Sequence, residues 1–203
     1  MSQQPRSLRA EQVAQTRDAL VSAGRLLFGR AGFTATSVED LARQAGVTTG
    51  ALYHHFPTKA ALFEAVFELV HRELMAASAE AALQASDPVE LLAAGFVAFL
   101  DKVLEPDIQQ IIITDAPSVL GLARFTELDE RYAFNAIVAA LRAADDAGAL
   151  RVEDPETLAR LLLGALTRGG MLIAGSPEPI ATRNAVAKTL RSMLNGLAPP
   201  PGD

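Results

Sequence analysis

Apolar residues recur along most of this chain at intervals of three, four and seven, the spacing that places them on one face of a helix. Val13, Leu20, Leu27 and Ala31 predict a first helix over about 10–31 that ends at Gly32. Similar spacing, with prolines at helix starts and glycines after helix ends, predicts helices at about 59–85, 88–104, 119–147, 155–174 and 179–195. The segment 108–114 is rich in β-branched residues, but one strand would have no partner, so a short buried helix is expected there. The pattern therefore predicts an all-α fold of about nine helices.

Capping residues divide the region around residues 36–59 into two short helices. Ser37 and Asp40 have the spacing of a capping box, and Gly46 suits the left-handed residue after the helix that they open. Thr48 can cap a third helix, residues 49–55, because its hydroxyl can accept from the free amides of the first turn. Two short helices joined by a glycine-containing turn form a helix-turn-helix, whose second helix can enter the major groove of DNA.

The side chains of this second helix suit contact with DNA. Thr48, Thr49 and Gly50 are small, so the backbone can approach base edges closely, and the threonines can donate, accept or touch a thymine methyl group. Tyr53 near the surface can reach phosphate oxygens, as can His54 and His55 beside it. The alternative is that one of these rings packs against the next helix, with His55 the first candidate for burial. A metal site is disfavoured, because adjacent residues on a helix face different directions.

Charge separates the two parts of the chain, although the whole carries a formal net charge of −6. Residues 1–59 carry +3 and the remainder −9, which suggests that only the first part meets a polyanion. With no cysteine, disulfides and thiolate metal sites are excluded. The first residues lack the apolar stretch of a signal peptide, and apolar runs such as 158–166 are shorter than the roughly 18 residues of a membrane span. A cytoplasmic protein without membrane contact is expected.

The stretch TSVEDLARQAGVTTGALYHHFPTK, residues 36–59, resembles the DNA-binding domain of the TetR (tetracycline repressor) family of transcriptional regulators. The likeness extends over about 12–70, including Leu26, Phe28, Gly32, Phe33, Leu62 and Phe63. It implies phosphate contacts from Thr36, Tyr53, His55 and Lys59, and base contacts near Ser37, Thr48, Thr49, Gly50 and His54. The alternative is a three-helix subdomain that touches no DNA. The expected division of the chain is a tail at 1–11, the DNA-binding domain at 12–70, a ligand-binding and dimerisation domain at 71–197, and a tail at 198–203.

The second domain carries large apolar side chains that form a core, line a cavity for a small apolar or amphipathic molecule, or do both. Polar residues set among them are candidates to orient such a ligand, although a structural ion pair explains the charged ones equally well. The residues proposed for the pocket are Phe96, Phe99, Ile112, Asp115, Arg124, Phe125, Tyr132, Asn135 and Arg168. No nucleophile–base set, phosphate loop or metal cluster stands out, so neither an enzyme activity nor a cofactor is expected.

The family resemblance also implies a homodimer in which the last two long helices of each chain form a four-helix interface. Their composition leaves one face too apolar for open water, and Gly164, Gly169 and Gly170 allow close approach. The residues proposed for this interface are Leu158, Leu161, Leu162, Ala165, Leu166, Ile173, Leu190 and Leu194. The implied mechanism is repression at a palindromic operator, relieved by an effector. Two alternatives remain: a helical enzyme, favoured by ionisable groups inside a cavity, and a regulator with a protein partner, favoured by a tightly filled body.

Overall fold

The computed structural model describes residues 8–83, 85 and 87–199, and within these ranges it contains helices and no strand. In chain order the elements are α1 (Leu8–Ala35), α2 (Val38–Ala45), α3 (Thr49–His55), α4 (Lys59–Ala82), α5 (Pro88–Val103), α6 (Pro106–Ile108), the π-helix η1 (Gln109–Asp115), α7 (Ala116–Leu120), α8 (Leu122–Asp146), α9 (Pro155–Ala174) and α10 (Pro179–Asn195). Because α6, η1 and α7 follow one another without a gap, the described residues form nine helical stretches. The prediction of an all-α fold is confirmed.

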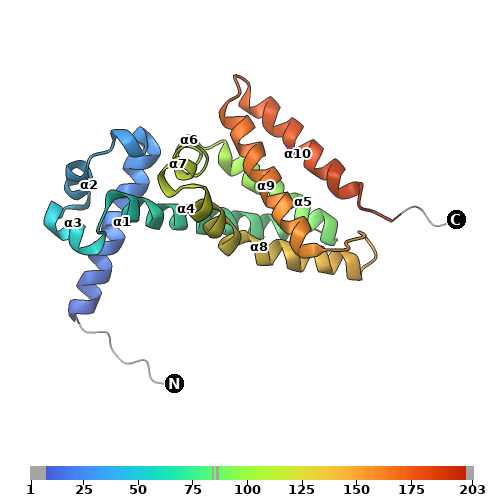
Figure 1. Cartoon of the computed structure of the whole chain (residues 1–203), viewed down its shortest axis with the longest axis horizontal. Coiled ribbons are helices and arrows are strands. Elements are labelled where there is room, and N and C mark those ends of the chain that lie inside the picture. The colour runs from blue at the N-terminus through green and yellow to red at the C-terminus, as the bar shows by residue number, and fades with distance from the viewer. Residues whose placement is uncertain (1–7, 84, 86, 200–203) are drawn as a thin grey trace.

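The chain forms a small N-terminal head, made of α1, α2, α3 and the start of α4, and a larger body made of the remaining helices. Figure 1 shows α4 running from the head into the body, so that one rigid element belongs to both parts. Within the head, the rings of Phe28, Phe33 and Phe63 lie 5.3–5.7 Å apart, and Leu41 and Leu52 are fully buried beside them. A single continuous core joins these residues to the interior of the body.

The caps predicted for the short helices are confirmed. The hydroxyl of Ser37 accepts from the amide of Asp40 at 3.0 Å, and that of Thr48 accepts from the amide of Ala51 at 3.1 Å. Gly46 follows α2 with φ 70°, the left-handed conformation that glycine adopts without strain. These caps fix the short turn between α2 and α3, and with it the orientation of α3 relative to α2.

The first helix, α1, differs from the predicted one in where it starts and in which residues it buries. It begins at Leu8, so the last four residues of the predicted tail, 8–11, are helical, whereas 1–7 and 200–203 lie outside the described residues. The predicted break at Gly32 is present, with φ 79°. However, Val13 and Ala31 are exposed, while Leu20 and Phe28 are fully buried. Of the four residues that predicted the helix, only some therefore face the core.

Two irregularities of the body were not predicted. The expected helix at about 119–147 is divided by Gly121, whose φ of 75° and ψ of 154° are not helical, into α7 and α8. The segment 108–114 is a buried helix, as predicted, but η1 has the π-helical hydrogen-bond pattern. Ile111, Ile112 and Ile113 are all buried there, because η1 packs against α1, α9, α5 and α4, which cover more than one side of it.

Two glycines assigned to the dimer interface serve packing inside one chain instead. A Cβ added to Gly170 would lie 2.6 Å from Cδ1 of Ile113, and one added to Gly169 would lie 2.7 Å from Cγ1 of Val186. These glycines therefore let α9 approach η1 and α10 closely. Gly164, by contrast, has no neighbouring atom within 4 Å of such a Cβ and remains on the surface.

The head contacts the body at a second place besides α4. The carboxylate of Asp115, at the end of η1, accepts from the backbone amide of Phe33 at 2.7 Å. On the same side, Arg25 pairs with Asp107 at 2.6 Å and with Glu73 at 3.3 Å. Burial opposes the ionisation of Asp107, but the hydrogen bond and charge of Arg25 outweigh it and hold the pKa of this carboxyl below its ordinary value. The head is thus fixed to the body by α4 and by this polar junction.

Candidate DNA-binding surface and ligand cavity

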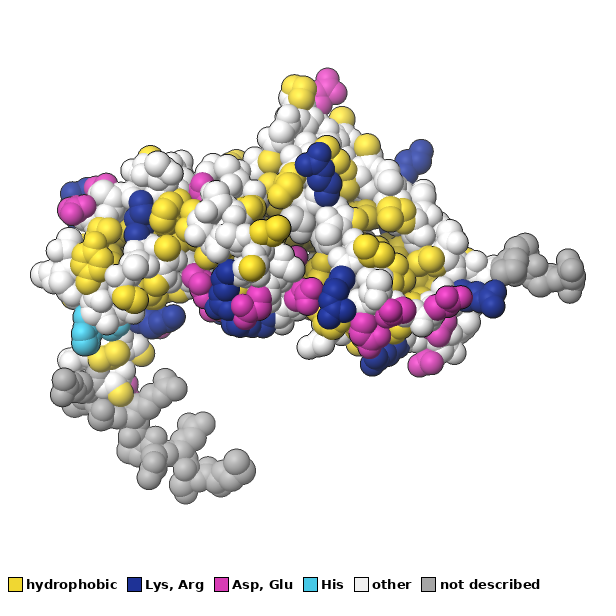
Figure 2. Space-filling model, in the orientation of Figure 1, with side chains coloured by type: hydrophobic (Ala, Val, Ile, Leu, Met, Phe, Trp, Pro, Cys, Tyr) yellow, Lys and Arg dark blue, Asp and Glu magenta, His cyan; other side chains and the backbone are white. Residues whose placement is uncertain are grey.

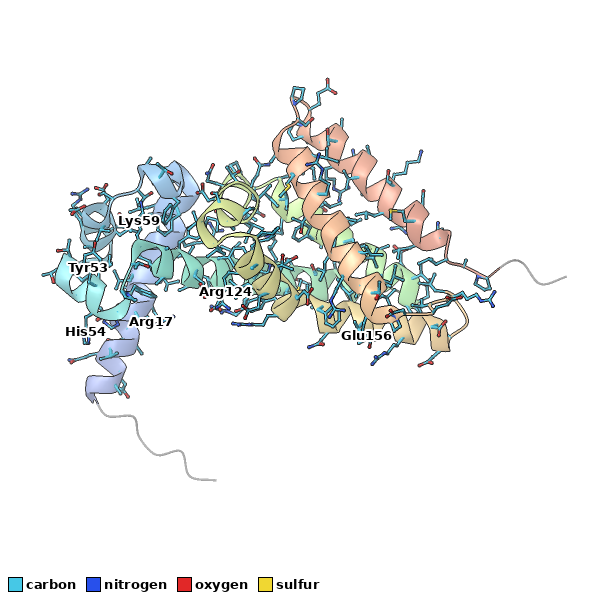
Figure 3. The ribbon with its side chains drawn as sticks, in the orientation of Figure 1. Arg17, Tyr53, His54, Lys59, Arg124 and Glu156 are labelled. Carbon is cyan, nitrogen blue, oxygen red and sulfur yellow. The ribbon has the colours of Figure 1, made fainter. Side chains whose placement is uncertain are left out.

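The exposed residues of α3 form the outer surface of the head. Thr48, Thr49, Gly50 and His54 are exposed, and Tyr53 retains 51% of its accessible surface. Leu52 faces the opposite way and is fully buried, which anchors the helix to the head. Figure 3 shows Tyr53 and His54 projecting from the side of the head farthest from the body. The arrangement presents small residues at the start of the helix and hydrogen-bonding rings farther along, which suits a recognition helix that enters the major groove of DNA.

Two residues of the predicted DNA-binding set are occupied inside the head. Thr36 is buried, and its hydroxyl donates to the carbonyls of Gly32 at 2.8 Å and Leu27 at 3.3 Å. The phosphate contact predicted for the Thr36 side chain is therefore wrong. Ser37 is half-buried, and its hydroxyl donates to the Asp40 carboxylate at 2.6 Å while it accepts from the same residue's amide. This capping role leaves little capacity for the base contact that was predicted.

Lys59 joins α4 to the broken end of α1. Its ammonium donates to the carbonyls of Phe33 at 2.8 Å and Thr36 at 2.9 Å, and it lies 4.1 Å from the centre of the Phe33 ring. Two of its three hydrogens are thus used within the head, and one remains for a phosphate oxygen. His55 is half-buried, as the alternative interpretation expected, with its ring 5.6 Å from that of His54.

Two basic side chains of the head were not predicted as part of this surface from the sequence. The guanidinium of Arg17 lies 5.1 Å from the centre of the Phe56 ring, directly after α3, and the residue is exposed. Figure 3 places Arg17 on α1 close to the side of the head that carries His54. Arg43 is exposed on α2 and pairs with Asp40. Neither residue belongs to α3, so only the folded head reveals that Arg17 lies beside the end of this helix.

The body contains a cavity of about 490 Å³ between α4, α5, α8 and α9. Phe96, Phe99 and Tyr132 line it, as predicted. Most other lining residues are aliphatic, and the exposed Leu83 and Leu91 lie where α4 ends and α5 begins. Figure 2 shows hydrophobic side chains gathered over the body, above a lower edge of alternating acidic and basic residues. The body is therefore not tightly filled, which argues against the regulator without a ligand site.

Six residues predicted for the pocket lie elsewhere. Ile112 is buried in η1, and Phe125 packs against Phe67 with ring centres 5.8 Å apart. Asp115 holds the Phe33 amide, and both Asn135 and Arg168 are exposed. None of these five lines the cavity, and the same is true of the sixth residue, Arg124. Ile112 and Phe125 were chosen as large apolar side chains and the other four as polar residues near such side chains in sequence, and neither criterion determines the direction of a side chain.

Arg124 shows that the ion-pair alternative was correct for this residue. Its guanidinium contacts Glu64 at 3.2 Å and Glu127 at 2.7 Å. Hydrogen bonds to these carboxylates raise the pKa of Arg124 and hold it in its charged form. Figure 3 shows this residue where α8 crosses α4, so it joins two helices of the body instead of orienting a ligand.

The polar end of the cavity was missed because its residues are far apart in sequence. Nε2 of His71 on α4 lies 3.1 Å from Oδ1 of Asp129 on α8, and both residues line the cavity. The His71 ring lies 4.4 Å from the ring of Phe67 and 5.6 Å from that of Tyr132. No feature of the sequence pairs His71 with Asp129. The pair lacks a nucleophile, and the described residues hold no group of three His, Cys, Asp or Glu that could bind a metal.

Helix α9 is apolar on more than one face, which changes the residues available for a dimer. Its length of 20 residues and mean hydropathy of 1.3 over 18 residues would suit a membrane span, but 39% of that window is buried inside the protein. A core helix meets the same criterion. The residues that the structure buries, and that therefore cannot form an outer interface as predicted, are Leu162, Leu166 and Ile173 of α9 and Leu190 and Leu194 of α10.

The outer face of these two helices consists of other apolar residues. Leu161 and Leu172 of α9 retain 67% and 47% of their accessible surface, and Ile180 and Met193 of α10 retain 67% and 51%. Leu158 and Ala165, also predicted for the interface, are half-buried. We call the exposed set of Leu161, Gly164, Leu172, Ile180 and Met193 the outer face. Leu161, Gly164 and Leu172 share one face of α9, and several exposed apolar side chains on adjacent helices are typical of a surface that another chain covers.

Two family sequence models match this chain. Residues 20–66 match the model described as bacterial regulatory proteins, tetR family, and residues 89–197 match that of the tetracyclin repressor-like C-terminal domain. The transcriptional repressor KstR2 of Mycolicibacterium smegmatis is 31% identical over 121 residues, which cover 59% of this chain and 59% of KstR2. The regulator TtgR of Pseudomonas putida is 38% identical over 61 residues, 30% of this chain and 29% of TtgR.

Solved structures share the whole architecture. A TetR-family transcriptional regulator from Pectobacterium atrosepticum has a TM-score of 0.84 and 31% identity, covering 95% of this chain and 98% of that one. RolR in complex with resorcinol has a TM-score of 0.75 and covers 92% of this chain and 90% of that one. At 18% identity the likeness to RolR is one of fold alone. The alignment with the Pectobacterium regulator includes both the head and the body, so the two parts have the same arrangement in that protein.

Proposed function

This chain belongs to the TetR family of bacterial transcriptional regulators, which are DNA-binding proteins and not enzymes, and we propose that it is a repressor controlled by a small molecule. The observation that carries this proposal is the exposed start of α3, Thr48–Gly50, on the outer side of a head whose α4 continues into a hollow body. One element thus joins a DNA reader to a ligand cavity. The protein would act in the cytoplasm, where its operator lies.

On DNA, Thr49 and Gly50 would approach base edges in the major groove, and Tyr53, Arg17 and the remaining hydrogen of Lys59 would contact phosphates. A single short helix reads too few base pairs for strong specificity, so two copies are required. Two chains that pair through the outer face would present their recognition helices to half-sites about 34–36 Å apart, one turn of DNA. The operator would then be palindromic, because a twofold dimer reads both half-sites alike.

The cavity is the proposed effector site. Its volume of about 490 Å³ lies within the range of small-molecule pockets, roughly 300–1,000 Å³, and its wall is mostly apolar. RolR, which shares this fold, holds the small aromatic molecule resorcinol. An effector of similar or larger size would contact α4 directly through His71 and Leu74, and α4 carries the head at its other end.

The proposal is tested by selecting duplexes from a random DNA library with the full-length protein. We expect enrichment of an inverted repeat whose half-site centres lie one helical turn apart. Enrichment of single, unpaired sites, or of no sequence at all, would contradict the proposed operator. The same selection with Thr49→Ala should enrich a different base near the centre of each half-site.

Base and phosphate contacts should respond differently to substitution. Thr49→Ala should change sequence preference, at a cost of about 1 kcal/mol for the wild-type base pair, the net worth of one hydrogen bond, whereas Tyr53→Phe should weaken binding to operator and scrambled duplex by similar factors. Thr49 suits this test better than Thr48, whose hydroxyl also caps α3. Fluorescence anisotropy with both duplexes measures the effects, and Thr126→Ala, an exposed threonine of α8, is the matched control. A uniform loss for Thr49→Ala would show that its contact is not with bases.

The polar junction between head and body should carry part of the effector's signal. Asp115→Ala removes the acceptor of the Phe33 amide and frees the end of α1 from η1. We expect effector affinity to remain and the effect of the effector on operator binding to fall at least about threefold, a fraction of a typical coupling energy. Asp146→Ala, an exposed aspartate at the end of α8, is the control. If the effector still lowers operator affinity to the same extent in Asp115→Ala, the effect is transmitted through α4 and not through this junction.

A further inference from the structure

The cavity wall contains one acidic side chain, Asp129, and its one basic side chain, the imidazole of His71, is paired with it. Among the 21 lining residues, those with polar side chains are His71, Ser78, Asp129, Tyr132 and Thr167. No lysine or arginine is among the described lining residues, so a carboxylate or phosphate inside the cavity would have no fixed positive partner and would face the Asp129 carboxylate. Burial of an unpaired charge is strongly unfavourable. The wall therefore disfavours anionic ligands.

The His71–Asp129 pair has a fixed orientation at this wall. His71 retains only 3% of its accessible surface, and its ring lies 4.4 Å from that of Phe67 and 5.6 Å from that of Tyr132. Because the carboxylate of Asp129 can only accept, the bond of 3.1 Å places a hydrogen on Nε2 of His71. The opposite nitrogen, Nδ1, is then an acceptor in the neutral ring.

Both remaining polar atoms of this pair are acceptors without a donor. Nδ1 of His71 is buried and has no hydrogen-bond partner among the described residues. Asp129 makes its one side-chain hydrogen bond through Oδ1, so within the described part of the chain Oδ2 has no donor either. Buried polar groups are nearly always paired, and an unpaired one costs free energy. Less than 1 Å² of Nδ1 is accessible, whereas the Asp129 side chain retains 17% of its accessible surface, so a ligand group that donates a hydrogen bond would reach this pair at Oδ2 of Asp129.

A hydroxyl suits this end of the cavity better than an ammonium group. The Asp129 charge is already partly compensated by the hydrogen of His71, and the other polar groups of the wall are neutral hydroxyls. An ammonium would lose its hydration for a single carboxylate that is shared with His71, and such a loss often exceeds the attraction gained. A hydroxyl loses far less and still makes a hydrogen bond to a charged acceptor, which is stronger than a neutral one.

We propose that the cavity takes an uncharged, mostly apolar molecule with one hydroxyl group, which donates a hydrogen bond to the His71–Asp129 pair. The apolar body of this ligand fills the space between Phe96, Phe99 and Leu166, which line the same cavity. The inference rests on the proposed function, because it gives the chemical class of the effector. Asp129 and His71 thereby become the residues that determine ligand specificity.

Matched probes test the class of ligand with the full-length wild-type protein. The probes are 4-pentylphenol, its methyl ether 4-pentylanisole, 4-pentylbenzoate and 4-pentylbenzylamine, whose affinities are measured by calorimetry and checked by the shift in Tm. The phenol should bind about tenfold or more tightly than each of the other three, because only it is uncharged and donates a hydrogen bond. Equal affinity of phenol and ether, tighter binding of the benzoate or the amine, or binding by none of the probes would overturn the proposal.

Variants locate the preference within the cavity. Asp129→Leu and His71→Phe should each remove most of the phenol's advantage over the ether, while Arg72→Gln, at an exposed position of α4, should retain it. Asp129→Leu provides the test if His71→Phe lowers Tm too far for calorimetry. A full advantage in Asp129→Leu would overturn the assignment.

Operator binding separates the ligand class from the proposed function. Release of the operator by a compound without a hydrogen-bond donor would overturn the ligand class and leave the repressor function intact. If the phenol binds with the expected preference but never changes operator affinity, the ligand class stands and the proposal that the cavity controls DNA binding fails.

Discussion

Leu161→Glu should convert the proposed dimer into monomers and lower operator affinity by about 100-fold or more. Leu161 retains 67% of its accessible surface in one chain and lies beside Gly164, where nothing in the protomer fills the space. In a twofold interface each substitution occurs twice, so two carboxylates would be buried near the symmetry axis without partners. A monomer binds one half-site and loses the avidity of two linked contacts, which is commonly worth about 10²–10⁴ in affinity.

Sedimentation velocity at micromolar concentration and anisotropy with the selected operator measure the two effects of Leu161→Glu. Ala139→Glu introduces the same charge at an exposed position of α8 and should remain a dimer with normal affinity. Circular dichroism should show that Leu161→Glu is folded, because the residue contributes little to the core. A dimer that persists in Leu161→Glu, or a wild-type protein that sediments as a monomer, would contradict the proposed interface.

Leu162, one residue away, illustrates why the interface could not be predicted residue by residue. Every position from Leu161 to Leu163 is leucine, so the periodic pattern of α9 has apolar residues on two faces. Only the packing of α9 against α8, α10, η1 and α5 determines that Leu162 is 2% exposed and that Leu161 is the outer residue. Leu162→Glu would therefore place a charge in the core and unfold the protomer, instead of giving a folded monomer.

The reader helix, by contrast, could be predicted because its signals are local. Ser37, Gly46 and Thr48 act on amides or dihedral angles within a few residues, and each has the predicted role. Thr36 shows the limit of this reasoning, since a threonine that follows a helix can donate back to its carbonyls and become buried. Lys59 shows the same limit, because the bend at Gly32 brings two carbonyls to its ammonium.

The cavity required three-dimensional information. His71 and Asp129 are 58 residues apart, and their contact depends on how α8 crosses α4 after the break at Gly121. That break was not predicted, since the flanking apolar pattern continues through it. Aromatic residues such as Phe96 and Phe99 were found because large apolar side chains on a core-facing stripe line any space that the core leaves open. The polar specificity of the site was not visible in the periodic pattern.

Effector and operator should weaken each other's binding by the same factor. An effector in the cavity would contact α4 through His71 and Leu74, and α4 begins in the head at Lys59. A change in the tilt of α4 would therefore alter the distance between the two α3 helices of the proposed dimer. A coupling free energy of about 1–3 kcal/mol would lower operator affinity roughly 5–150-fold, and thermodynamic linkage requires operator DNA to raise the effector's Kd equally. Calorimetric titration of a cavity-binding compound, with the protein free or saturated with operator, measures this factor. A scrambled duplex at the same concentration is the control and should leave the Kd of the compound unchanged. Identical dissociation constants with and without operator would show that the cavity does not control DNA binding.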